Sequence, residues 1–324
     1  MAKDPKTFYK YRAFNTTTLE SLVHDTVYFA SPSSFNDPLD CVPSVECDST
    51  NEDLRELLAF LIRRRVESEI LRNLTQARIK SERASNHAQR KARLQVNQEL
   101  QNIAYHATNP DYGMAVEEAE SWLLVQEVQR ELDRHYVRGV CSFSTTFSSP
   151  LLWSHYGDQH QGLCIGYGVK RDPPPKFNKV IYGGNRSIKT SVLTKSFIHK
   201  DMKAQATLDR DVLLRKAKGW SYEREWRLIG EQGSQDSPLL LKDITFGIRC
   251  SSSVIHSVVS ALTGREGGLE FYEMRTVQGS FALRRRLLDI DELRSNLPRT
   301  ARSGIEMFGR GEGEFNRAEV MPNE

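Results

Sequence analysis

A long helical segment divides a chain that otherwise has the pattern of short β-strands. Its first part has apolar residues at every fourth position: Leu54, Leu58, Ile62, Val66, Ile70 and Leu74. This spacing places them on one face of a helix. A second, highly charged helical stretch runs from about residue 75 to 106, and a third from about 114 to 136, after the break at Asn109-Pro110. Residues 51–136 are therefore predicted to form a helical insertion.

The flanking segments have the composition of strands and turns. FYKYRAF, VYFASP, YVRGVCSFST, LCIGYGV and YEREWRLIG are rich in aromatic and β-branched residues and are separated by turn-forming residues. Residues from about 187 to 219 are predicted to be helical, because 191–217 contain no Gly or Pro. We expect an α+β fold with a single mixed or antiparallel β core. The core would comprise residues 1–50 and 137–298, interrupted by the insertion and followed by a flexible tail, 299–324.

Composition excludes several classes of protein. No apolar run approaches the roughly 18 residues needed to cross a bilayer, and the N-terminus lacks a secretory signal, so we expect a cytoplasmic protein without membrane contact. The five cysteines are odd in number and none has CxxC spacing, which argues against a disulfide framework and a cysteine zinc site. No Gly-rich phosphate loop, GxSxG or HExxH motif is present.

Positive charge is concentrated in the helical segment. The whole chain has a net charge of +3, whereas residues 61–94 contain ten Lys or Arg against three acidic residues. A basic stretch of this kind can bind nucleic acid through its phosphates. The alternative is a solvated surface, or a surface that pairs with a protein target or with a second copy of the chain.

The YEREWR segment holds the most informative pair of acids. If it is a strand, Glu223 and Glu225 share one face and Arg224 lies on the other. Trp226 and the apolar residues after it indicate a central strand, where two carboxylates without a role are costly. The alternative is that both acids face solvent or pair with Arg.

Two further strand segments carry groups suited to a ligand. Ser142 and Ser144 of SFST share a face and could hold a ribose or a backbone group. Arg12, at the end of the first strand, has the planar fork of donors that clamps phosphates. Ordinary half-exposed serines and a salt bridge of Arg12, for example to a glutamate, are the alternatives.

Two polar segments allow either a structural or a functional interpretation. In WSHYGDQH, Trp153, Tyr156 and His155 could stack on a planar ring and donate a hydrogen bond, or could be core and capping residues. Two histidines five residues apart suit a metal poorly, so we expect no metal. In FNDPLD, Asn36 and Asp37 could belong to a site or simply form a turn around Pro38.

Taken together, the motifs resemble a large bacterial family catalogued only as a domain of unknown function. Members share a YKYR-like start, a segment similar to FNDPLD, a Trp-x-His-Tyr segment and a final Glu-x-Glu-Trp-Arg. The matching segments here are 9–12, 29–40, 153–162 and 223–227.

A second resemblance concerns mechanism. The order of Arg, Ser-x-Ser and Glu-x-Glu is similar to the Arg-Ser-Glu signature of ADP-ribosyltransferases. The resemblance implies that fold, with NAD as the substrate and Arg12 on its phosphates. It also implies that Ser142 and Ser144 shape the nicotinamide-ribose pocket, that Glu225 is catalytic, and that Glu223 positions the acceptor. The middle motif departs from Ser-Thr-Ser, since SFST stands here.

Three hypotheses about function follow. The first is an ADP-ribosyltransferase or NAD glycohydrolase, acting as a toxin or antiphage defence effector that modifies nucleic acid or protein. The second is a nucleic-acid-binding or nuclease-like defence component that uses the basic helices 61–94. The third is a non-enzymatic sensor or partner-binding module.

Overall fold

The computed structural model describes residues 5–79, 82–135, 138–302 and 306. Its centre is an eight-stranded sheet in the order β14-β13-β12-β5-β1-β4-β10-β6, antiparallel except between β12 and β13. The predicted α+β class is confirmed. The strands are β1 (Thr7–Arg12), β4 (Gly139–Ser144), β5 (Leu163–Gly168), β6 (Asn178–Lys179), β10 (Glu225–Gly230), β12 (Leu240–Phe246), β13 (Glu270–Thr276) and β14 (Leu283–Leu287).

Three short ladders and the remaining helices surround this sheet. In the ladders, β2 (Thr26–Phe29) pairs with β11 (Gly233–Asp236), β3 (Ser44–Glu46) with β8 (Ser187–Lys189), and β7 (Ile181–Tyr182) with β9 (Arg215–Lys216). The helices outside the insertion are α1 (Thr16–Val23), α5 (Pro150–His155), α6 (Thr190–Phe197), α7 (Met202–Leu213), α8 (Ser252–Leu262) and α9 (Ile290–Asn296). Short 3₁₀ turns are η1 (Pro32–Ser34), η2 (Pro110–Tyr112) and η3 (Lys218–Glu223).

The sheet opens between the neighbouring strands β1 and β4. β1 pairs with β5 along its whole length, but it pairs with β4 only at Tyr9 and Ser144. Beyond that point, β4 is not paired with β1. The carbonyl of Ser142 accepts a hydrogen bond from Lys10 Nζ at 3.0 Å instead. The split brings side chains from both faces of the sheet to one place, since neighbouring residues of a strand point to opposite faces.

Different helices cover the two faces of the sheet. Apolar residues of α1 and α8 pack with Phe8 and Phe143 on one face. On the other face, Trp153 of α5 packs with Tyr9 and Tyr11. The alternation along β1 thus buries its tyrosines on one side and leaves Lys10 and Arg12 for the other.

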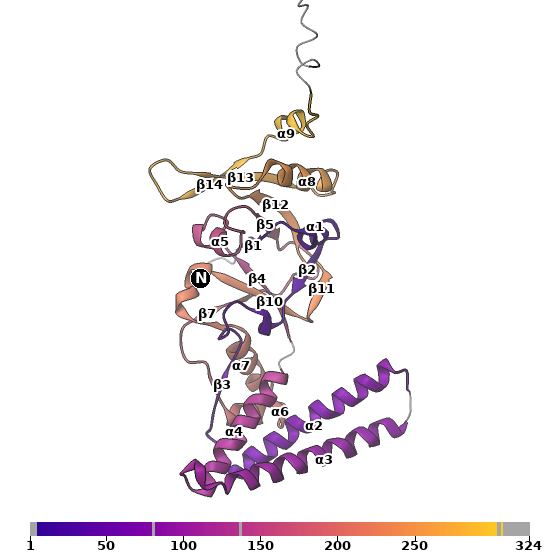
Figure 1. Ribbon diagram of the computed structural model, residues 1–324, viewed down its shortest axis with the longest axis vertical. Helices are drawn as coiled ribbons and strands as arrows, with labels where there is room; N and C mark the ends of the chain where they lie inside the picture. Colours follow the sequence, from indigo (N-terminus) through magenta and orange to yellow (C-terminus); the bar gives the residue numbers. More distant parts are fainter. Residues whose placement is uncertain (1–4, 80–81, 136–137, 303–305, 307–324) are drawn as a thin grey trace, which may run out of the picture.

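The helical insertion consists of α2 (Asn51–Gln76), α3 (Glu82–Ala107) and α4 (Val116–His135). Helix α2 begins with a capping box, in which Thr50 and Asp53 satisfy each other's backbone N–H groups. The predicted apolar face packs against α4 and α3 from Leu54 to Val66, and the same cluster continues into α6 and α7, whereas Ile70 and Leu74 are partly exposed and lie outside it. Figure 1 shows α2 and α3 as a long antiparallel pair that projects from one end of the molecule.

The predicted helix at 187–219 is wrong in its extent. Helix α6 ends at Phe197 and α7 begins at Met202, because Asp201 caps the new helix by accepting from the backbone N–H of Lys203 and Ala204. Residues 215–216 then form β9. Most of the expected tail from residue 299 lies outside the described residues.

We expect Leu58→Ala to lower the free energy of unfolding by about 2–5 kcal/mol, because Leu58 is fully buried where α2 meets α4 and its loss leaves a cavity. Leu94→Ala is the matched control, since Leu94 is 57% exposed, and should change stability by less than about 0.5 kcal/mol. Urea titration followed by circular dichroism measures both. Equal losses would contradict the packing described for the insertion.

Candidate functional site

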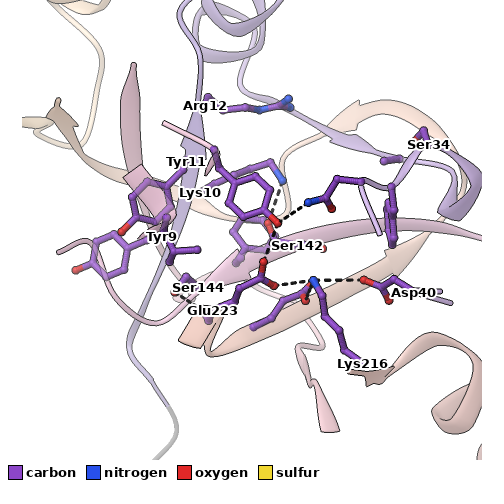
Figure 2. A pocket seen from close by; sticks show the side chains of 17 residues that line it. Tyr9, Lys10, Tyr11, Arg12, Ser34, Asp40, Ser142, Ser144, Lys216 and Glu223 are labelled. Atoms are coloured by element: carbon purple, nitrogen blue, oxygen red, sulfur yellow. Dashed lines mark hydrogen bonds and ion pairs between the residues drawn. The ribbon is translucent and has the colours of Figure 1, made fainter. Parts of the chain in front are cut away.

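A pocket of about 390 Å³ lies at the split between β1 and β4. Seven of the ten residues singled out in the sequence line it: Arg12, Asn36, Ser142, Ser144, Tyr156, Glu223 and Glu225. They come from β1, the loop after η1, β4, α5 and β10 with the turn before it. Figure 2 shows Arg12 at one end of the pocket, apart from Glu223, Lys216 and Asp40 at the other.

The two glutamates reach the pocket from different backbone conformations, so the expectation of one shared strand face is wrong. Glu223 is the last residue of η3, and Arg224 adopts a left-handed conformation with φ of 49°. β10 begins only at Glu225. The turn is fixed by Ser144, whose hydroxyl donates to the Glu223 carbonyl at 2.6 Å. Both carboxylates are nevertheless buried side by side, and the side chain of Arg224 is exposed.

A fully buried arginine holds one of these acids in place. Arg227 follows Glu225 by two residues on β10 and therefore shares its face. Its Nε lies 2.8 Å from Glu225 Oε1, and its Nη2 lies 2.7 Å from Asp40 Oδ2. Nη1 donates to the carbonyl of Leu213 at 2.7 Å. The guanidinium thus ties the FNDPLD turn and the end of α7 to β10.

A buried lysine joins three carboxylates. Lys216 Nζ lies 2.6 Å from Glu223 Oε2, 3.0 Å from Glu225 Oε2 and 3.3 Å from Asp40 Oδ2. Burial alone would lower the pKa of Lys216, but Glu225, Glu223 and Asp40 outweigh it and raise that pKa. The lysine is therefore a permanent cation between the acids. Lys216 and Arg227 together leave the group of three acids with one negative charge in excess when all are ionised.

The pKa values of the two glutamates are shifted in opposite directions. Burial would raise the pKa of Glu225, but Arg227, Lys216 and a hydrogen bond from Ser142 lower it to about 2. Burial raises the pKa of Glu223, and the nearby Glu225 charge adds to the effect. A fixed anion next to an acid whose pKa is raised is a typical arrangement in catalytic sites.

Tyr156 connects Glu223 to the pocket mouth. Its hydroxyl donates to Glu223 Oε1 at 2.7 Å and accepts from the amide of Asn36 at 3.1 Å. Burial and the Glu223 acceptor raise the pKa of Tyr156, so the hydroxyl remains protonated. The pair can therefore orient one carboxylate oxygen while the other stays on Lys216.

The opposite end of the pocket is basic. Arg12 is partly exposed and forms no ion pair within the described part of the chain. Lys10, also in the lining, bonds the Ser142 carbonyl and lies over the Phe143 ring, and burial lowers its pKa. The free guanidinium of Arg12 is therefore the group best placed to bind an anion.

The structure does not bring Trp153, His155 and Asp37 to the pocket lining. Trp153 is fully buried under the sheet, and its Nε1 donates to the carbonyl of Phe147. His155 is exposed at the end of α5. Asp37 makes a turn, because its Oδ1 accepts from the backbone N–H of Leu39, while its Oδ2 accepts from Trp220. The core-packing alternative thus describes Trp153 and the turn alternative describes Asp37, whereas no hydrogen bond of the described residues supports a capping role for His155.

Three charged residues of the site, Asp40, Lys216 and Arg227, are not among these ten candidates. Asp40 belongs to the FNDPLD segment, for which a site and a turn were both considered. Arg227 lies in YEREWR two residues after Glu225, a spacing that places both side chains on one face of the strand. That spacing was a usable signal. Lys216 stands on a two-residue strand with no motif around it, and no sequence signal marks it.

Comparison with known proteins adds one match. Residues 152–228 match a family described as "Protein of unknown function (DUF2971)". The expected resemblance to a domain of unknown function is thereby confirmed for the part of the chain that carries Tyr156, Lys216, both glutamates and Arg227. No significant match to a curated protein or to a solved structure was found. Among the described residues, no helix combines the length and hydropathy that a membrane crossing requires.

We expect Arg227→Met to destabilise the fold by about 3–5 kcal/mol, because it leaves Asp40 and Glu225 buried with less compensation. Arg224→Met, in the same motif but exposed, is the control and should cost less than about 0.5 kcal/mol. The measurement is the midpoint and slope of denaturant unfolding. A loss for Arg227→Met no larger than the control's would contradict the anchoring role.

The depressed pKa of Glu225 predicts a pH dependence of stability. The unfolded chain takes up a proton at Glu225 near its ordinary pKa of 4.5, whereas the folded chain does so only near 2. The stabilisation is complete above about pH 5 and is lost as pH falls toward 2. The difference in unfolding free energy between the wild type and Glu225→Gln should therefore shrink between pH 5 and pH 3. A difference that stays constant or grows would show that Glu225 is not the depressed group.

Proposed function

We propose that the pocket binds NAD and breaks its nicotinamide–ribose bond, as in an ADP-ribosyltransferase or NAD glycohydrolase. One observation carries the proposal: the strands bearing Arg12, Ser142 with Ser144, and Glu225 are consecutive in the sheet, β1-β4-β10. The three groups come from distant parts of the sequence, yet they line one pocket. This arrangement supports the resemblance to the Arg-Ser-Glu signature and to its fold.

Glu225 is suited to stabilise developing positive charge. When the bond between ribose C1′ and nicotinamide breaks, its electron pair leaves with nicotinamide and the ribose becomes oxocarbenium-like. A carboxylate with a pKa of about 2 is ionised at every physiological pH, so it needs no reorganisation to stabilise that charge. The partners Arg227 and Lys216 fix its position, although they also reduce its field.

Glu223 is suited to the acceptor. Its raised pKa makes it the better proton acceptor of the two glutamates. In the proposed reaction the acceptor's oxygen or nitrogen bonds to C1′, and its proton passes to Glu223. With water as the acceptor, the products are nicotinamide, ADP-ribose and a proton.

Arg12 is proposed to bind the NAD diphosphate. It lies at the end of the pocket away from the glutamates, as Figure 2 shows, and has no internal carboxylate partner among the described residues. The phosphates would therefore lie at one end of the pocket and the reacting ribose at the other. Ser142 and Tyr156 add hydrogen-bonding groups to the lining, and the Tyr156 hydroxyl lies beside Glu223.

The proposed biological role is that of a cytoplasmic toxin or antiphage effector that modifies nucleic acid or protein. Physical features of the helical insertion support two other roles. A nuclease-like or nucleic-acid-binding component would rely on the basic helices. A non-enzymatic sensor would rely on the long helices to contact a partner or a second copy of the chain.

The test is incubation of the full chain with NAD labelled in the adenylate part, with total nucleic acid and total protein as acceptors. We expect nicotinamide release, reduced about 100-fold or more by Glu225→Gln because an electrostatic group of the transition state is lost. Glu223→Gln should lower transfer to the acceptor more than it lowers nicotinamide release. Arg12→Ala should raise KM for NAD more than it lowers kcat.

Glu231→Gln is the matched control, since Glu231 is an exposed acid just after β10, and it should act as the wild type. Circular dichroism of each variant shows whether the fold is kept. Absence of both nicotinamide release and label transfer by the folded wild type would overturn the proposal. So would equal activity of the wild type and Glu225→Gln.

A further inference from the structure

The α2–α3 pair extends past the helix that supports it. Arg55 and Arg65 of α2 pair with Glu120 and Glu131 of α4, so these helices run parallel with a constant offset of 65 to 66 residues. Helix α4 ends at His135, level with about residue 70 of α2. Residues 70–98, the end of α2 and the first part of α3, are the basic arm, and because α3 runs antiparallel to α2 its part of the arm reaches back to about the level of residue 60 of α2. Figure 1 shows the arm projecting away from the sheet.

Positive charge on the arm is nearly unopposed. Residues 70–98 contain seven Lys or Arg and a single acidic residue, Glu82. Five of these cations have described side chains, and all five are exposed: Arg72, Arg78, Arg90, Lys91 and Arg93. None of the five forms an ion pair within the described residues. They stand within a few turns of one another on two packed helices, so their like charges repel.

Nearer the core, arginines of the helical insertion form ion pairs with glutamates. There, Arg55 pairs with Glu120, and Glu131 is shared by Arg65 and Arg134. Acidic partners are thus present for the arginines that face α4, whereas the five described cations of the arm form no ion pair within the described residues. An external anionic partner would relieve the repulsion that the arm retains.

We propose that the basic arm binds the phosphate backbone of nucleic acid. Four of the five described cations are arginines, whose planar donor forks suit phosphate. Exposed amides lie among them at Asn73, Gln76, Asn86, Gln89 and Asn97. Amide side chains donate to phosphate and sugar oxygens, and such contacts give binding without sequence preference.

The apolar residues of the arm argue against a membrane partner. A helix that lies on a bilayer needs a continuous apolar face directed outward. Here the apolar face of α3, Ala88, Ala92 and Val96, is buried in the helical bundle. The exposed apolar residues Leu71, Ile79 and Leu94 stand singly among polar neighbours. The chemistry of the arm is therefore that of a polyanion site.

The length of the arm sets the size of the contact. Fifteen helical residues, from 84 to 98, span about 22 Å at 1.5 Å per residue. One strand of a duplex presents about six phosphates over that length. With three to five of them neutralised, the logarithm of the binding constant should fall with the logarithm of salt concentration with a slope of about −3 to −4.5.

The test is fluorescence anisotropy of the full chain with labelled duplex DNA, duplex RNA and single-stranded RNA, without NAD, at several salt concentrations. The arm variant is Arg90→Glu, Lys91→Glu and Arg93→Glu together. The control variant is Lys170→Glu, Lys176→Glu and Lys203→Glu, three exposed lysines elsewhere that give the same change in net charge. Vesicles with phosphatidylserine are titrated in parallel.

We expect the wild type to bind at least one nucleic acid with the predicted salt slope. The affinity should fall at least 10-fold in the arm variant and less than 3-fold in the control variant. No binding at low salt, or equal losses in the two variants, would overturn it, as would binding to vesicles alone. The binding does not depend on the proposed NAD chemistry, because NAD is absent and both glutamates are unchanged.

Discussion

The buried guanidinium of Arg227 is the interaction on which the rest of the site depends. It forms ion pairs with Glu225 on its own strand and with Asp40 from a loop far away in sequence, and it also donates to the carbonyl of Leu213 just after α7. Burying two carboxylates without this cation would cost several kcal/mol. With it, a core position can hold an ionised glutamate at the edge of a pocket. Lys216 then extends the network to Glu223, and the three acids share two cations.

The split between β1 and β4 gives this network access to a ligand. The two strands are paired only at Tyr9 and Ser144, and the pocket lies where this pairing ends. There, Lys10 satisfies the carbonyl of Ser142, and the pocket has its acids at one end and Arg12 at the other. The charges are thus divided along the pocket, which suits a substrate with phosphates at one end and developing positive charge at the other.

Part of this site could be predicted from the sequence, because its residues stand in short motifs that can be read locally. These motifs identified Arg12, both serines and both glutamates as candidates, and all five line the pocket, although Glu223 reaches it from a turn and not from the expected strand. Two features depend on tertiary structure and could not be predicted. The left-handed conformation of Arg224 places Glu223 outside the strand, and the pairing of β9 places Lys216 next to the glutamates. Trp153 was predicted to belong to the site but lies in the core. Its motif suggested ring stacking on a ligand, but an aromatic residue beside a turn packs equally well in the core. The helical insertion was predictable from its four-residue period, whereas the break between α6 and α7 rests on a single cap at Asp201.

The most direct measurement is a crystal structure of the protein with a non-hydrolysable NAD analogue. The account predicts density for the analogue in the split between β1 and β4, with its diphosphate on Arg12 and its nicotinamide ribose beside Glu225 and Glu223. Density for the analogue at another place, or a reversed orientation with the phosphates beside Lys216, would contradict it.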